Sequence, residues 1–137
     1  MSAHIGRPFT GRLHSANASA GVEVPIREDG ATAAYTLKAH EYLEVTDVTI
    51  VSVAGGDVFA HFGAAADTTP TDPVTIIRGT VAANGGVARG SDFKHIGANG
   101  ALVFAVAPNG VVDVAIQGVI RNGSREVADR PAYREAL

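Results

Sequence analysis

The chain of 137 residues contains no cysteine and no tryptophan. Without cysteine it can form no disulfide, no thiolate metal site and no cysteine nucleophile, and its redox compartment is left open. Aromatic residues make up only 6% of the chain. The sequence therefore lacks the stacking platforms with which many proteins hold sugars or single-stranded nucleic acid.

Basic charge is also scarce. Lys38 and Lys94 are the only lysines, and the formal net charge is -3. Because phosphate backbones are bound by clusters of Lys and Arg, we expect no nucleic-acid partner. No apolar run reaches the roughly 18 residues of a membrane span, and the N-terminus lacks the charged and apolar regions of a signal peptide. We therefore expect no membrane partner and synthesis in a cytosol.

Motifs for catalysis and metal binding are missing too. Glu41 and Glu44 lie on opposite faces if residues 41–44 form a strand, which makes them a poor acid/base pair. Asp67 and Asp72 flank a Thr- and Pro-rich loop without EF-hand spacing, so turn capping is favoured over calcium binding. Neither a His-x-His nor a His-x-x-x-His pair occurs among the five histidines, which are His4, His14, His40, His61 and His95. We predict no enzymatic activity, no cofactor and no metal.

Asn-Gly pairs divide the second half of the chain. They separate runs rich in Val, Ile and Ala, and they stand at Asn84-Gly85, Asn99-Gly100, Asn109-Gly110 and Asn122-Gly123. Asn-Gly readily adopts the positive φ angles that tight hairpin turns require. The spacing therefore predicts antiparallel strands that fold back on one another.

The apolar pattern supports the same fold class. A phase change in the run 42–53 predicts a β-bulge near Thr46 and Asp47. We find no convincing internal helix. The predicted strands cover residues 35–39, 42–53, 58–62, 74–83, 89–96, 101–107 and 111–121. About eight short strands with regular turn signals predict an all-β antiparallel β-sandwich, and among sandwiches they favour a jelly roll.

The sandwich domain is predicted to span residues 22–121, with a segment outside it at each end. Residues 1–21 are small and polar with no sustained period, which predicts an extended arm. This arm is cationic because it contains Arg7 and Arg12 and no acid.

Residues 122–137 contain acidic and basic side chains in close alternation, and they are predicted to form a C-terminal tail. Tyr133 and Leu137 are four residues apart and can dock one helical turn on a neighbouring subunit. A disordered terminus is the alternative.

Several predicted strands are apolar on both faces. In residues 58–62, Val58, Ala60 and Phe62 alternate with Phe59 and His61. Small residues tolerated at the surface are one explanation. The other is burial of the outer face between identical subunits, which predicts an interface containing Phe59, His61, Tyr133 and Leu137. His61 is then a hydrogen-bonded interior or interface residue, and a response of the assembly to pH is a hypothesis.

Three segments within residues 35–121 resemble small phage virion proteins of jelly-roll type, especially head decoration (cement) proteins. The segments are His61-Phe62-Gly63, residues 77–86 and residues 106–114. The resemblance implies a homotrimer on the outer surface of a capsid, in a virion assembled in the host cytoplasm. It also implies an extended terminal arm that reaches across major capsid subunits and stabilises the shell.

The expected anchors of that arm are Arg7, Phe9, Arg12 and Leu13. Deletion of residues 1–20 is expected to leave a folded trimer that no longer co-sediments with capsids. A receptor- or carbohydrate-binding module of a tail fibre or spike is the alternative function. A cupin-like isomerase or epimerase is a third class, but it needs a pocket of His and acid residues that we cannot assemble from this sequence.

Overall fold

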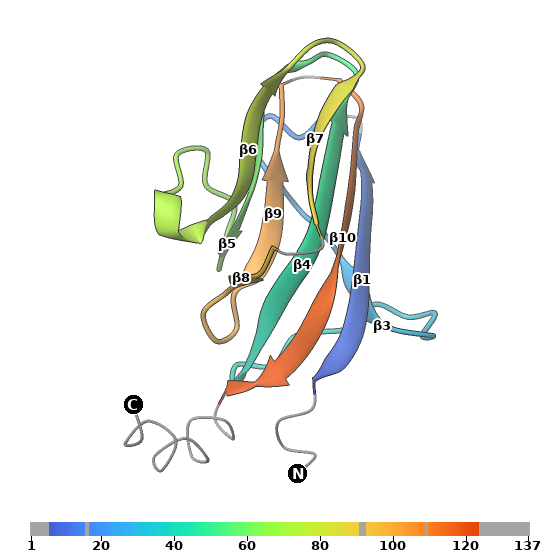
Figure 1. Cartoon of the computed structure of the whole chain (residues 1–137), viewed down its shortest axis with the longest axis vertical. Coiled ribbons are helices and arrows are strands. Elements are labelled where there is room, and N and C mark those ends of the chain that lie inside the picture. Colours follow the sequence, from blue (N-terminus) through green and yellow to red (C-terminus); the bar gives the residue numbers. More distant parts are fainter. Residues whose placement is uncertain (1–5, 16, 91–92, 109, 124–137) are drawn as a thin grey trace.

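A computed structural model describes residues 6–15, 17–90, 93–108 and 110–123, which form two antiparallel sheets packed face to face (Figure 1). The first, sheet A, has the order β3 (Ile26–Glu28), β1 (Arg7–Ser15), β10 (Val112–Asn122), β4 (Glu41–Ser52) and β7 (Gly85–Arg89), and β8 (His95–Ile96) also pairs with β4. The second, sheet B, has the order β2 (Val22–Glu23), β9 (Leu102–Val106), β5 (Gly56–Gly63) and β6 (Thr75–Val81). The predicted antiparallel sandwich is confirmed.

Eight of these strands form nested pairs. β1 pairs with β10, β2 with β9, β4 with β7, and β5 with β6. The connection between β5 and β6 contains the short 3₁₀ turn η2 (Asp72–Val74), and it joins the innermost pair. The chain therefore forms one long two-stranded ribbon, wrapped so that successive pairs fall alternately into sheet A and sheet B.

The predicted antiparallel strands are confirmed. However, the two Asn-Gly pairs that lie between described strands do not close hairpins within one sheet. Asn84-Gly85 leads from β6 in sheet B to β7 in sheet A, and Asn99-Gly100 leads from β8 in sheet A to β9 in sheet B. Asn109 lies outside the described residues, and Asn122 is the last residue of β10, with Gly123 directly after it. Asn84 (φ 64°) and Gly100 (φ 77°) do adopt positive φ. The expected local conformation is therefore present, but the turns cross between the sheets.

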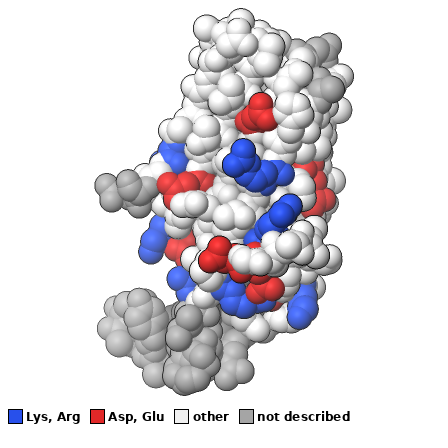
Figure 2. Space-filling model, turned by 90° about the vertical axis from the view of Figure 1, so that its right-hand side faces the viewer, with Lys and Arg blue, Asp and Glu red and all other residues white. Residues whose placement is uncertain are grey.

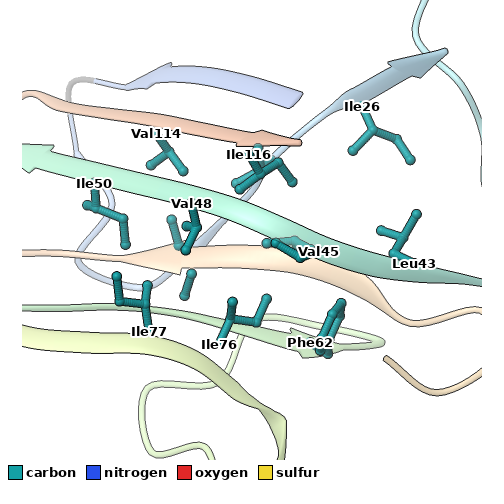
Figure 3. Packing of buried hydrophobic residues seen from close by; sticks show 14 of the residues in the cluster. Ile26, Leu43, Val45, Val48, Ile50, Phe62, Ile76, Ile77, Val114 and Ile116 are labelled. Carbon is teal, nitrogen blue, oxygen red and sulfur yellow. The ribbon is translucent and has the colours of Figure 1, made fainter. Parts of the chain in front are cut away.

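The core lies between the two sheets and is filled by inward-facing aliphatic and aromatic side chains. Figure 3 shows Val48 and Ile50 of β4 facing Ile76 and Ile77 of β6 across this layer. The predicted bulge in β4 is confirmed, because Asp47 pairs with Gln117 while Val45 pairs with Gly118. The extra residue, Thr46, shifts the alternation of side chains by one position. Val45 and Val48 are therefore both buried in the core although they are three residues apart.

Most predicted strands correspond to observed ones, with two differences. Residues 35–39 form no strand; the Tyr35 N–H donates to the Ile26 carbonyl oxygen (2.7 Å) as an isolated contact beside β3. The predicted strand 89–96 is divided between the end of β7 and the separate strand β8.

The predicted arm 1–21 is wrong for residues 7–15, which form β1. This strand is hydrogen-bonded to β10 on one side and to β3 on the other, and Phe9 is only 1% exposed. Phe9, Gly11 and Leu13 alternate with polar residues, a period-2 signal that could have revealed the strand. Deletion of residues 1–20 would therefore remove an interior strand, and a folded deletion variant is no longer expected.

Candidate functional site

The first and last described strands meet at one end of the sandwich (Figure 1). Arg7, at the start of β1, pairs with Ile120 near the end of β10. The Gly123 N–H donates to the His40 carbonyl oxygen (2.7 Å), and the Gly100 N–H donates to that of Glu41 (2.6 Å). We call this the tail end, defined by residues 6–8, 38–41, 96–101 and 120–123. The opposite end carries residues 53–55 and 82–84, together with 107–108 and 110–111.

An open apolar hollow of about 410 Å³ lies beside the tail end. Its walls come from the end of β5, the 3₁₀ turn η2, and the residues from Ile96 of β8 to Ala101 before β9. The lining residues are Phe62, Gly63, Ala64, Pro73, Val74, Ile96, Gly97, Ala98, Asn99, Gly100 and Ala101. None of them carries a formal charge, and Ile96 is 59% exposed. This tail-end hollow is an apolar recess of the size that proteins use to bind ligands or side chains.

An ionic cluster joins β1 to the segment that precedes β4. Arg7 Nη1 donates to Glu28 Oε2 (2.9 Å), and Arg7 Nη2 donates to Tyr35 Oη (3.2 Å) and to the buried Glu41 carboxylate. Burial opposes the charge on Glu41. Hydrogen bonds from the Tyr35 hydroxyl (2.6 Å) and the Lys38 N–H (2.9 Å), together with the charge of Arg7, nevertheless lower its pKa.

A second buried carboxylate, Glu44, lies on the outer face of sheet A. Arg121 Nε donates to Glu44 Oε1 (2.6 Å), and Lys94 Nζ lies 3.4 Å from Glu44 Oε2. Burial again opposes ionisation, but the hydrogen bond and charge of Arg121 and the charge of Lys94 lower the pKa of Glu44. The intervening Leu43 faces the core, so Glu41 and Glu44 point to opposite sides of β4 as predicted. Each is an ion-pair partner that ties strands together.

The predicted anchors have different environments. Phe9 belongs to the core, so its prediction as an anchor is wrong. The Arg7 guanidinium is committed to the ionic cluster and lies 5.2 Å from the centre of the Tyr35 ring. Leu13 is half-buried against the core, whereas Arg12 is exposed on the outer face of sheet A. Of the four, Arg12 remains freely available to a partner.

Part of the outer face of sheet B, around Phe59 and His61, is buried within the chain itself. Phe59 is 4% and His61 1% exposed, so the prediction that they face a neighbouring subunit is wrong. His61 Nε2 accepts a hydrogen bond from the Asp67 N–H (3.1 Å), and its Nδ1 donates to the Phe62 carbonyl oxygen (3.0 Å). A Cβ placed on Gly21 would lie 2.6 Å from Ala66 Cβ, so residues 64–71 extend as far as the start of β2. The other two predicted interface residues, Tyr133 and Leu137, lie outside the described residues.

Charges of both signs are interleaved on the side of the molecule formed by β1 and β3. Figure 2 shows Lys and Arg next to Asp and Glu over much of this face, with few charges toward the end opposite the tail end. The hydrogen bond between His14 Nδ1 and Asp113 Oδ1 (2.6 Å) lies on the same sheet. This face therefore offers no extended patch of a single sign.

Within residues 6–15, 17–90, 93–108 and 110–123, no three His, Asp or Glu side chains come together in a way that could hold a metal ion. The same residues contain no helix that is long and apolar enough to cross a membrane. Comparison of the sequence with protein-family models gave no match, and comparison with curated proteins gave none either.

Proposed function

We propose that this protein is a structural component of a phage virion, a decoration (cement) protein that binds the outer capsid surface as a homotrimer and stabilises the shell. The observation that carries the proposal is the tail end: both ends of the described chain and an exposed apolar hollow lie together there. A subunit that attaches to a shell by one end needs its contact groups gathered at that end.

The strand arrangement supports the jelly-roll part of the resemblance. Eight strands in nested pairs, four in each of two sheets, are typical of double-sheet jelly rolls. The short strands β3 and β8 are additions at the margins of sheet A. This fold is used by capsid proteins among others, so it is compatible with the proposal without identifying the partner.

The attachment that we propose differs from a long N-terminal arm, because residues 7–15 belong to the sandwich. The contact groups are instead the tail-end hollow, residues 1–5 and 124–137, and Arg12 on the flank. A trimer offers three such sets, so local opening of the shell would require all three to separate together. Many weak contacts then act as one strong attachment, and no covalent bond is needed.

The alternative role in carbohydrate binding gains no support from Tyr35. Sugar sites use open aromatic faces, but the Tyr35 ring is approached by Arg7 and its hydroxyl donates to Glu41. We therefore retain the capsid role as the proposed function.

The proposal is tested by measuring the native mass of the protein and its co-sedimentation with shells of the major capsid protein from the same virus. We expect a trimer that pellets with the shells, and we expect Ile96→Glu to abolish pelleting by placing a charge at the exposed edge of the hollow. Val53→Glu is the matched control, because Val53 is 46% exposed but lies at the opposite end. A monomer that stays in the supernatant would refute the proposal, and equal pelleting of both variants would refute attachment through the tail end.

A further inference from the structure

We infer that the tail-end hollow binds the C-terminal segment of the same molecule, residues 124–137, through Tyr133 and Leu137. The hollow is apolar and uncharged, and Ile96 at its edge is a large aliphatic side chain left mostly in contact with solvent. An apolar recess of this kind gains stability when another apolar group covers it.

The exit point of the segment favours this occupant. Gly123, the last described residue, is packed so closely on the hollow that a Cβ placed on it would lie 2.1 Å from Asn99 Oδ1. Asn99 is itself a lining residue of the hollow. The C-terminal segment therefore begins at the rim of the recess that we assign to it.

The length of the segment is sufficient for it to turn back. Tyr133 follows Gly123 by ten residues, which span about 15 Å as a helix or up to about 33 Å when extended. A group tethered so closely has an effective concentration of the order of millimolar. The molecule's own segment is therefore favoured over that of a second copy at ordinary protein concentrations.

The composition of the segment matches the recess. Pro131 is well suited to the first turn of a helix, and Tyr133 and Leu137 then lie on one face of it. Arg134 and Glu135 are on other faces and stay in water. A tyrosine also suits a site with a polar rim, because its ring can fill the apolar part while its hydroxyl remains near Asn99.

The inference goes beyond the virion role, because it concerns a contact within one molecule. It makes the hollow a site that the protein itself occupies. A capsid subunit that contacts the hollow would compete with residues 124–137 for it.

Disulfide trapping tests the contact directly, since the chain has no cysteine of its own. In the full-length protein we would combine Ala98→Cys, inside the hollow, with Tyr133→Cys. Under mild oxidation we expect an intramolecular crosslink. The matched control combines Tyr133→Cys with Ala54→Cys, another exposed alanine but at the opposite end of the sandwich. Crosslinking in the control should be at least about tenfold slower, because tethering does not bring the two groups together.

Each outcome decides the inference. Crosslinked dimers in place of intramolecular crosslinks would mean that a second copy fills the hollow, and equal rates in the test and control pairs would mean that the segment has no preferred site. Either result overturns the inference. No capsid takes part, so the outcome is separate from that of the co-sedimentation experiment.

A second readout does not depend on a disulfide. Tyr133→Trp introduces the only tryptophan, and we expect blue-shifted emission that does not change on dilution and moves to the red when Ile96→Glu is added. The Val53→Glu variant should leave the emission unchanged. A solvent-exposed emission spectrum that Ile96→Glu does not alter would overturn the inference.

Discussion

The outer faces of the two sheets differ sharply although both sheets share one core. On sheet A, Arg12, Asp113 and Gln117 point outward and are exposed, in regular alternation with buried residues. On sheet B, Phe59 and His61 also point outward, yet both are buried within the same chain. His61 is bonded to Asp67 of the β5–β6 connection, and the Arg78 guanidinium lies over the Phe59 ring, 4.7 Å from its centre.

This difference shows that strands with two apolar faces need not indicate a subunit interface. The β5–β6 connection begins with three alanines, Ala64, Ala65 and Ala66, and Ala66 reaches the start of β2. Closing a loop of this length costs little more entropy than closing a short one, since the cost grows only with the logarithm of length. A long connecting loop can therefore pack over part of an outer face at little additional entropic cost.

The largest expected effect comes from removing an aromatic ring from the outer face of sheet B. The Phe104 ring is stacked on His61 with 5.6 Å between ring centres. We expect Phe104→Ala to lower the free energy of unfolding by about 3 kcal/mol, as for a core phenylalanine. Val51→Ala, on the outer face of sheet A and 37% exposed, should change it by less than about 0.5 kcal/mol. Urea unfolding of both variants measures the contrast, and equal small effects would mean that the outer face of sheet B is not a second core.

A smaller effect is expected from releasing the covering loop. His61→Leu leaves the Asp67 N–H without its acceptor, which should lower the free energy of unfolding by about 1–3 kcal/mol. Amide hydrogen exchange of residues 64–71 should accelerate at the same time. His14→Leu is the matched control, since the His14 side chain is 70% exposed on sheet A. If exchange in the loop is the same in both variants, His61 does not hold the cover in place.

The smallest effect concerns Glu44 on sheet A and depends on pH. Because its pKa is lower in the folded protein than in the unfolded chain, its contribution is fully present above about pH 4.3 and is lost as the pH falls through the folded pKa. Glu44→Gln should lower the free energy of unfolding by about 1 kcal/mol at pH 7, and this loss should shrink as the pH falls through the folded pKa of Glu44. Asp113→Asn, whose side chain is 56% exposed, is the control. Thermal unfolding across a series of acidic pH values measures this, and a loss at pH 7 that does not diminish at any lower pH would rule out ionisation as its cause.

The features that could be predicted were local. Alternation in β4 and β10 identified these strands, and the change of phase near Thr46 identified the bulge. β1 was missed because Gly11 interrupts its apolar face, although that glycine is required: a Cβ there would lie 2.7 Å from Ile116 Cγ1. The predicted strand at 35–39 does not form. Tyr35 and the Lys38 N–H bind the carboxylate of Glu41, and the Tyr35 N–H makes a single backbone hydrogen bond to Ile26 of β3 that is not continued as a ladder.

The site was harder to predict than the strands. The lining residues of the tail-end hollow lie between Phe62 and Ala101, and none belongs to a recognisable motif. The sequence did indicate that residues 122–137 are unlike the sandwich. It contained no sign that β1 begins beside the end of β10, or that Asn99 meets Gly123.

The sequence by itself determined an all-β chain with positive-φ turns at Asn84 and Gly100 and a bulge at Thr46, because these depend on the side chains of neighbouring residues. The tertiary structure alone decided that the turns cross between sheets, that His61 is bonded to its own loop and that the start of β1 lies beside the end of β10. The physical reason is that backbone hydrogen bonds are alike in every pair of strands. The choice of partner is therefore made by the packing of the whole core, in which Arg7 and Ile120 become neighbours although almost the entire chain separates them.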